Sequence, residues 1–259
     1  MSHPIIIVPA RWASERFPGK PLAPIKGATG SARPLVLRTV DAARTVNGCS
    51  AFVATDDARI RHVVEEAGSA VAMTSPDCRN GTERVAEASR DLPDDAIVVN
   101  VQGDAPLTPP WYVEALLEAM EADPSIEVAT PVLRTADDHL DRLMADRKEG
   151  RVGATTAVTD RAGRALYFSK EILPFGAVGG AVLHHVGVYA YRRRALMRYV
   201  ALPQGCAEAA EGLEQLRFLE NGIPVQCVEV DARGRRFWEV NNPSDVAEVE
   251  AILKAEGIP

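Results

Sequence analysis

A loop with three cations follows the first apolar run of the sequence. Residues 5–8 are continuously apolar, which is typical of a strand buried on both faces. The loop after them carries Arg11, Arg16, Gly19 and Lys20. Ligands of open α/β sheets bind at this end of a strand, and backbone amides with three cations can hold a polyphosphate. GxxxxGK[ST] is absent, so this is no Walker A loop, and a solvated basic loop explains the same residues equally well.

An acidic residue follows the strongest predicted central strand, residues 96–101. Gln102, Gly103 and Asp104 come directly after it. A carboxylate in this place is a usual Mg²⁺ ligand beside phosphates. Asp and Gly also favour turns, so a simple turn explains this tetrapeptide somewhat better when it is taken alone.

A third candidate segment contains Asn80, Gly81 and Thr82, followed by Glu83 and Arg84. Its structural interpretation is a turn with a helix N-cap at Thr82 or nearby. A loop that reads a nucleotide base would use the same amides and the same hydroxyl. Taken alone, the segment is best explained as a cap.

These three segments lie on a regular alternation of strands and helices. The first half predicts strands at 5–8, 51–54, 70–73 and 96–101, and helices at 35–46, about 58–68, 82–92 and 110–122. Repeated βαβ units indicate a doubly wound α/β fold with a mostly parallel sheet. The second half predicts closely spaced, antiparallel strands at 128–133, 155–158, 165–168 and 186–192. Helices at 212–221 and 243–254 flank a last strand at 224–230.

Composition excludes several classes of protein. The chain has 259 residues, 46% hydrophobic and 25% charged, which is typical of a globular protein rather than a disordered one. A formal net charge of −7 argues against nucleic-acid binding. No apolar run approaches the roughly 20 residues that cross a bilayer, so no membrane partner is expected. Four scattered cysteines suggest neither a zinc site nor a disulfide scaffold, and we expect a cytoplasmic protein.

Taken together, the motifs resemble one family, the CMP-Kdo synthetases (3-deoxy-manno-octulosonate cytidylyltransferases). The family patterns PARxxSxRxPGKPL, SGT[DE]R and VNVQGDEP correspond to residues 9–22, 80–84 and 99–106. Further stretches match in order at 54–56, 165–169, 185–191, 213–217 and 240–245. The resemblance covers nearly the whole chain, and the ordered set is far more specific than any single motif.

The resemblance implies a cytidylyltransferase that transfers CMP from CTP to an acidic acceptor and releases pyrophosphate, with Mg²⁺ as cofactor. It implies a Rossmann-like nucleotidyltransferase fold in a single domain, residues 1–259. Within it we expect a nucleotide-binding core at 1–133 and 213–259 and an antiparallel acceptor and dimerisation subdomain at 134–212. The family is typically dimeric, so a homodimer is expected.

The resemblance also assigns site residues by position. It implies catalytic roles for Arg11, Lys20 and Asp104, and metal ligation by Asp104 and Asn241. The implied nucleotide-binding residues are Pro9, Ala10, Arg11, Arg16, Lys20, Asn80, Gly81, Thr82, Arg84 and Gln102. The implied acceptor-binding residues are Gln102, Lys170, His185, Tyr189, Glu214 and Gln215.

The sequence departs from the family pattern mainly in its acceptor half. Lys170 replaces the arginine of LYFSR and loses a bidentate carboxylate fork, and the strand lysine expected in 151–158 is missing. The connection 170–184 is short. These departures predict an acceptor other than Kdo, such as the small phosphonate phosphonoformate. CMP-Kdo synthetase proper remains the alternative.

The sequence also departs from the family pattern in the nucleotide half. For this reason a non-catalytic nucleotide-binding protein remains an alternative interpretation. Asn241 replaces the aspartate of VDTPED and removes one charge from the metal site, and Ala105 and Asn80 replace a glutamate and a serine. Lys20 and Asp104 are retained, which favours an enzyme. A dinucleotide-dependent oxidoreductase is excluded because no GxGxxG follows the first strand. Trp12 either covers a ligand or packs in its loop.

Overall fold

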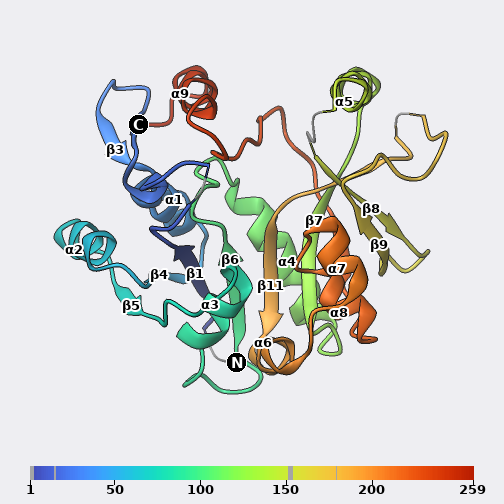
Figure 1. Cartoon of the computed structure of the whole chain (residues 1–259), viewed down its shortest axis with the longest axis horizontal. Helices are drawn as coiled ribbons and strands as arrows, with labels where there is room; N and C mark the ends of the chain where they lie inside the picture. Colours follow the sequence, from blue (N-terminus) through green and yellow to red (C-terminus); the bar gives the residue numbers. More distant parts are fainter. Residues whose placement is uncertain (1–2, 15, 151–153, 179) are drawn as a thin grey trace.

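Helices cover both faces of one mixed β-sheet (Figure 1). The computed structural model describes residues 3–14, 16–150, 154–178 and 180–259, and within these residues the sheet has ten strands. Its order is β5-β4-β1-β6-β11-β7-β10-β8-β9, with β12 also paired to β7. The predicted doubly wound α/β fold is confirmed, and its parallel part is the β5-β4-β1-β6 side.

The parallel strands are apolar on both faces because each face meets a layer of helices. They are β1 (Ile5–Ala10), β4 (Ser50–Thr55), β5 (Val71–Met73) and β6 (Ile97–Val101). In β1, Ile6 and Val8 enter one hydrophobic core, while Ile7 enters the other. A continuous apolar run therefore marks this strand instead of an alternating one.

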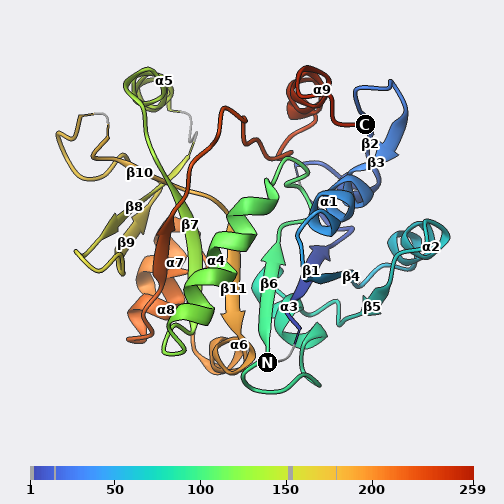
Figure 2. The ribbon, with the colours of Figure 1, turned by 180° about the vertical axis from the view of Figure 1, so that it is seen from behind.

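The two helical layers follow from this alternation (Figure 2). The first core contains side chains of α1 (Leu35–Arg44), α2 (Ala58–Glu66) and α4 (Pro110–Ala122). The second contains side chains of α3 (Gly81–Ala88), α6 (Arg193–Ala201) and α8 (Leu216–Glu220). A third, smaller core joins α9 (Asp245–Ala255) to the short hairpin of β2 (Pro24–Lys26) and β3 (Ala32–Pro34).

The second half adds the antiparallel strands that its close spacing predicts. These are β7 (Val128–Arg134), β8 (Thr155–Thr159), β9 (Ala165–Ser169), β10 (Leu183–His185) and β11 (Val188–Arg192). The last strand, β12 (Gln226–Glu229), returns parallel to β7. β11 lies between β6 and β7, so part of the segment 134–212 sits in the middle of the sheet.

Several predicted boundaries are wrong. The strand expected at 186–192 is present as β11 but begins only at Val188, and the short strand β10 before it was not predicted. The helix expected at 212–221 starts only with α8, because Gly212 adopts a left-handed φ of +61° and ends a separate helix, α7 (Cys206–Glu211). The sequence analysis also missed α5 (Asp137–Lys148), α6, the β2–β3 hairpin and the 3₁₀ turn η1 (Lys20–Leu22).

Three segments meet at one edge of the sheet, above the carboxyl ends of β1 and β6. They are the loop after β1, the turn after β6 and the chain between β12 and α9, which crosses the top of both views (Figures 1 and 2). This edge carries most of the candidate site. Within the described ranges, no helix has the length and apolar character needed to cross a membrane.

Candidate functional site

The loop after β1 and the turn after β6 are in direct backbone contact. A Cβ on Gly103 would lie 2.5 Å from the carbonyl oxygen of Pro9, so only glycine fits at that position. Thr39 Oγ1 donates to the carbonyl of Gly103 at 3.1 Å, and Ala105 N–H donates to the carbonyl of Gln102 at 2.9 Å. The segment Gln102–Ala105 is therefore a turn, and this turn fixes Asp104 beside the first loop.

Lys20 and Asp104 form an ion pair, with Lys20 Nζ 2.5 Å from Asp104 Oδ2. Gly19 makes this possible, because its left-handed φ of +71° starts the 3₁₀ turn that carries Lys20. The two side chains are only 16% and 22% exposed. The structure thus brings together two of the residues to which the resemblance assigns catalytic roles.

The two arginines of the loop lie on its open side. Arg11 and Arg16 are both exposed, and Arg16 Nη2 donates to Asn241 Oδ1 at 3.5 Å. Trp12 packs in its loop. It packs against Gly19, and the guanidinium of Arg59 stacks on its ring at 3.4 Å from the centroid. Trp12 therefore supports the loop that carries the cations.

The segment before α9 is tied to Asp104 by its backbone. Val240 N–H donates to the carbonyl of Asp104 at 2.9 Å, and the Val240 side chain is fully buried in the third core. Glu239 and Asn241 flank Val240, and their side chains hydrogen-bond to each other. Asn241 therefore lies beside the first loop, 3.5 Å from Arg16.

Glu239 is a site residue that the sequence analysis missed. Burial, together with the nearby carboxylate of Asp104, raises the pKa of Glu239 to about 7, although the hydrogen bond from Asn241 and the charge of Lys20 act in the opposite direction. Its only sequence signal is its position, two residues before Asn241 on an extended segment. Such spacing places both side chains on one face of the chain.

The oxygen donors at this edge fit a magnesium ion. Within the described residues, no three His, Cys, Asp or Glu side chains form a group that could hold a metal ion, so a site here would combine carboxylate and amide oxygens. Asp104, Glu239 and Asn241 are all hard oxygen ligands, and Mg²⁺ is bound in proteins by one or two carboxylates with water and phosphate completing its shell.

Asn80 is the N-cap of α3. Its Oδ1 accepts from Glu83 N–H at 2.8 Å, and its Nδ2 donates to Tyr199 Oη at 3.0 Å. The cap that we expected at or near Thr82 therefore lies two residues earlier. Thr82 N–H instead donates to Glu214 Oε2 at 3.2 Å, which links the predicted base loop to the predicted acceptor residues.

Two further predicted nucleotide residues differ in their surroundings. Gln102 lies against Gly81, where a Cβ would come within 3.0 Å of Gln102 Oε1, so the turn after β6 reaches the start of α3. Arg84 is only 2% exposed. Its guanidinium lies 3.3 Å from Asp56 Oδ2 and donates to Thr74 Oγ1, so it holds α3 against the ends of β4 and β5.

Glu214 contacts the start of α3, whereas Lys170 contacts the chain just before Glu214, at Glu211 and Gly212. Burial raises the pKa of Glu214, which the N–H and hydroxyl of Thr82 and the N–H of Gly81 partly counter. Lys170 N–H donates to Glu211 Oε2 at 2.9 Å, and Lys170 Nζ lies beside Gly212. Gln215 is buried, and its Nε2 has no hydrogen-bond partner among the described residues.

His185 and Tyr189 are buried in the sheet. The His185 ring lies between Phe168 and Tyr189, with centroid distances of 5.1 and 5.5 Å, and its Nε2 is 2.9 Å from Thr130 Oγ1. Burial lowers the pKa of His185 to about 3, so the imidazole is neutral. Burial, the stacked Tyr191 and the charges of Glu214 and Glu239 raise the pKa of Tyr189 well above its usual range.

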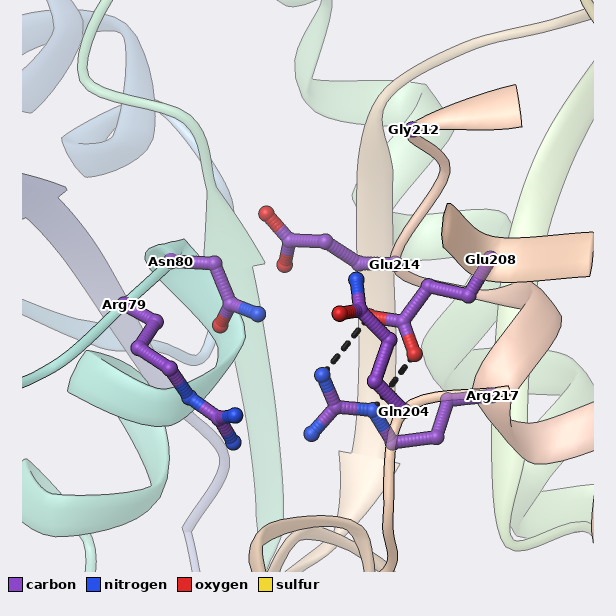
Figure 3. Close-up of a pocket in the computed structure, with 7 residues that line it drawn as sticks. All are labelled: Arg79, Asn80, Gln204, Glu208, Gly212, Glu214 and Arg217. Carbon is purple, nitrogen blue, oxygen red and sulfur yellow. Dashed lines mark hydrogen bonds and ion pairs between the residues drawn. The ribbon is translucent and has the colours of Figure 1, made fainter. Parts of the chain in front are cut away.

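A cavity of about 320 Å³ opens beside the start of α3 (Figure 3). Arg79 and Asn80 face it from one side, and Glu208 and Glu214 from the other. Arg217, buried behind it, pairs with both carboxylate oxygens of Glu208 at 2.7 Å. Gln204 and Gly212 complete the lining, whereas Lys20 and Asp104 do not belong to it. The sequence analysis singled out neither Gln204 nor Glu208.

Known proteins match this chain in sequence. Residues 5–228 match the family described as "Cytidylyltransferase". The chain is 46% identical over 258 residues to the 3-deoxy-manno-octulosonate cytidylyltransferase of Maricaulis maris, covering 98% of each chain. It is 41% identical over 260 residues to the protein of the same name from Anaeromyxobacter sp., again covering 98% of each.

Solved structures give the same result. A structure of CMP:2-keto-3-deoxy-manno-octonic acid synthetase complexed with CTP superposes with a TM-score of 0.84 at 34% identity, covering 98% of this chain and 100% of that one. An inositol-1-phosphate CTP transferase from T. maritima, at 14% identity and a TM-score of 0.65, covering 98% of this chain and 96% of that one, shares the fold. The chain is a nucleotidyltransferase and belongs to the cytidylyltransferase family, together with the 3-deoxy-manno-octulosonate cytidylyltransferases that it resembles over its whole length.

Proposed function

We propose that this enzyme transfers CMP from CTP to 3-deoxy-manno-octulosonate (Kdo) and releases pyrophosphate. The observation that carries the proposal is the Lys20–Asp104 pair at the ends of β1 and β6, beside a cavity that Asn80 and Glu214 line. This reaction needs a cation and a metal-binding carboxylate for the nucleotide, and a cavity for the acceptor; the cavity here lies at the start of α3. The relatives that share the whole chain length are named for this reaction.

On the triphosphate side, the cations of the first loop stabilise the negative charge that develops on the phosphate oxygens. As the acceptor oxygen attacks the α-phosphorus and pyrophosphate leaves, charge grows on the bridging and β-phosphate oxygens. Fixed positive charges from Lys20, Arg11 and Arg16 stabilise that charge more in the transition state than in the ground state. A magnesium ion held by Asp104, with Asn241, would supply further positive charge at these oxygens.

The cytidine is held by the segment around α3. Asn80 and Thr82 already order the start of that helix, and Gln102 packs against Gly81. Pro9 and Ala10 end β1 on the floor of this region. Backbone amides here are suited to a base and a ribose, whereas the guanidinium of Arg84 acts beneath the surface, through Asp56.

The acceptor lies on the Glu214 side of the site. Gln102, Lys170, Tyr189 and Gln215 are the groups that we propose to contact it, with His185 behind Tyr189. The departures in this half predicted a small phosphonate such as phosphonoformate. The comparisons favour the alternative, the sugar acid, because similarity to the Kdo enzymes extends through residues 134–212 as well.

We also propose a homodimer. β9 is the edge strand of the sheet, and an open strand edge is a usual site of pairing. The exposed Leu166, Phe175 and Val178 lie on or after this strand, with Phe175 fully exposed. Light scattering at micromolar concentration tests this, and a monomeric mass would contradict it.

Pyrophosphate release tests the proposed function against a non-catalytic relative. The protein is incubated with CTP, Mg²⁺ and Kdo, and with each of the three omitted in turn. Release that needs all three supports the proposal. A protein that binds CTP, by calorimetry, and yet releases no pyrophosphate with any acidic acceptor would be a binding protein instead.

A further inference from the structure

We propose that Glu239 provides the second carboxylate of the metal site and replaces the charge that is absent at Asn241. The inference rests on the proposed function, because it concerns the metal that this reaction uses. Asn241 offers a neutral amide oxygen, while Asp104 is paired with Lys20 at 2.5 Å. A divalent cation at this edge therefore needs another negative group. The position of Glu239 allows its carboxylate to provide that charge.

The backbone places Glu239 at this edge of the sheet. The hydrogen bond from Val240 N–H to the carbonyl of Asp104, 2.9 Å long, ties the segment to the turn after β6. The Val240 side chain enters the third core, so the side chains of residues 239 and 241 leave the chain on the opposite side. Asn241 Oδ1 is also within 3.5 Å of Arg16, so this side faces the first loop.

The carboxylate of Glu239 lies against the backbone bend between β10 and β11. A Cβ on Gly187, in the bend between β10 and β11, would lie 3.0 Å from Glu239 Oε1. Asn241 hydrogen-bonds to the same carboxylate, and Asp104 acts on it electrostatically. Two carboxylates that share one site repel each other, and a cation between them removes that repulsion.

No protein cation fulfils this role for Glu239. Within the described residues, it makes no ion pair with a lysine or arginine side chain, whereas Lys20 is engaged with Asp104. Carboxylate and amide oxygens are the donors that Mg²⁺ and Mn²⁺ take.

Metal binding without turnover tests the inference. The affinity for Mn²⁺ is measured by electron paramagnetic resonance on the whole protein with CTP and without acceptor. Glu239→Gln keeps the shape of the side chain and removes its charge, and we expect Mn²⁺ affinity to fall about tenfold or more. The double variant Glu239→Gln/Asn241→Asp returns the charge two residues further on and is expected to restore affinity to within about threefold.

The matched control is Glu118→Gln, on an exposed position of α4, and it is expected to leave Mn²⁺ affinity unchanged. Unchanged affinity in Glu239→Gln, or a double variant as weak as the single one, would overturn the inference. If circular dichroism shows Glu239→Gln to be unfolded, Glu239→Asp, whose shorter carboxylate should bind Mn²⁺ several-fold more weakly, decides in its place. Wild-type protein that binds Mn²⁺ but releases no pyrophosphate would contradict the proposed function alone.

Discussion

Lys20 Nζ lies 2.5 Å from Asp104 Oδ2, and this pair joins the loop after β1 to the turn after β6. Both groups follow buried parallel strands, β1 and β6, which are neighbours in the sheet. One contact therefore links the cation proposed for the triphosphate to the carboxylate proposed for the metal. The first prediction follows from it.

Lys20→Ala should damage turnover far more than folding. Removing a fixed cation from a phosphoryl-transfer site costs about 10²–10³ in rate. The Lys20–Asp104 pair is only partly buried, so its loss should cost less stability than the roughly 3–5 kcal/mol of a fully buried pair. We expect kcat/KM to fall about a hundredfold or more in the pyrophosphate assay. Lys26→Ala, at an exposed position of the β2–β3 hairpin, is the control. Parent-like kinetics for Lys20→Ala would show that this cation does not act on the phosphates.

Gly19→Ala tests whether Trp12 supports the cationic loop. Gly19 has a φ of +71°, and an added Cβ would lie 3.1 Å from Trp12 Cη2. Gly30 has a φ of +79° and no atom within 4 Å of the same position, so Gly30→Ala carries the backbone strain alone. We expect kcat/KM with CTP to fall about tenfold in Gly19→Ala and less than twofold in Gly30→Ala. Equal effects would mean that the stacking of Arg59, Trp12 and Gly19 does not position the loop.

Arg217→Met should destabilise the protein strongly. Arg217 is almost fully buried and pairs with Glu208 at 2.7 Å and with Glu83 at 3.5 Å. Its removal leaves the buried Glu208 carboxylate without its cation, whereas Glu83 keeps Arg79. We expect a loss of about 3–5 kcal/mol in the free energy of unfolding, measured in urea. Arg198→Met breaks an exposed pair with Glu127 and should cost less than about 1 kcal/mol. A small loss at Arg217 would show that the network behind the cavity is not structural.

His185 should make stability depend on pH. Its pKa is lowered from 6.5 to about 3 by burial, so between these values the unfolded chain binds a proton that the folded chain does not. Stability from this group is present above pH 6.5 and is lost as the pH falls towards 3, at up to about 1.4 kcal/mol per pH unit. Between pH 7 and pH 5, urea unfolding should show a loss about 2 kcal/mol larger in wild type than in His185→Gln. Equal losses would place the imidazole in a more hydrated setting than the structure gives it.

The sequence predicts the places of candidate residues best where those residues come directly after strands. Lys20 and Asp104 could be predicted to lie together because parallel neighbours such as β1 and β6 end at the same sheet edge. The antiparallel second half could be predicted because its strands are closely spaced.

The other features of the site depend on tertiary packing, which no local sequence pattern predicts. Glu239 reaches the site because Val240 bonds to Asp104, a contact between residues far apart in the chain. Asn80 takes the cap that we expected near Thr82, because Thr82 N–H has Glu214 as its acceptor. The helix α7, with Glu208, was missed because it is only six residues long and ends at Gly212. Arg84 matched the motif, yet tertiary packing against Asp56 buries it.

The central claim concerns the acceptor, and side-by-side kinetics test it most directly. The enzyme is assayed with CTP and Mg²⁺ at saturating concentrations, and kcat/KM is measured for Kdo and for phosphonoformate. The account predicts efficient, saturable turnover of Kdo, with phosphonoformate weaker by at least about two orders of magnitude. Turnover of phosphonoformate that equals or exceeds that of Kdo would contradict it and return the acceptor half to the phosphonate interpretation.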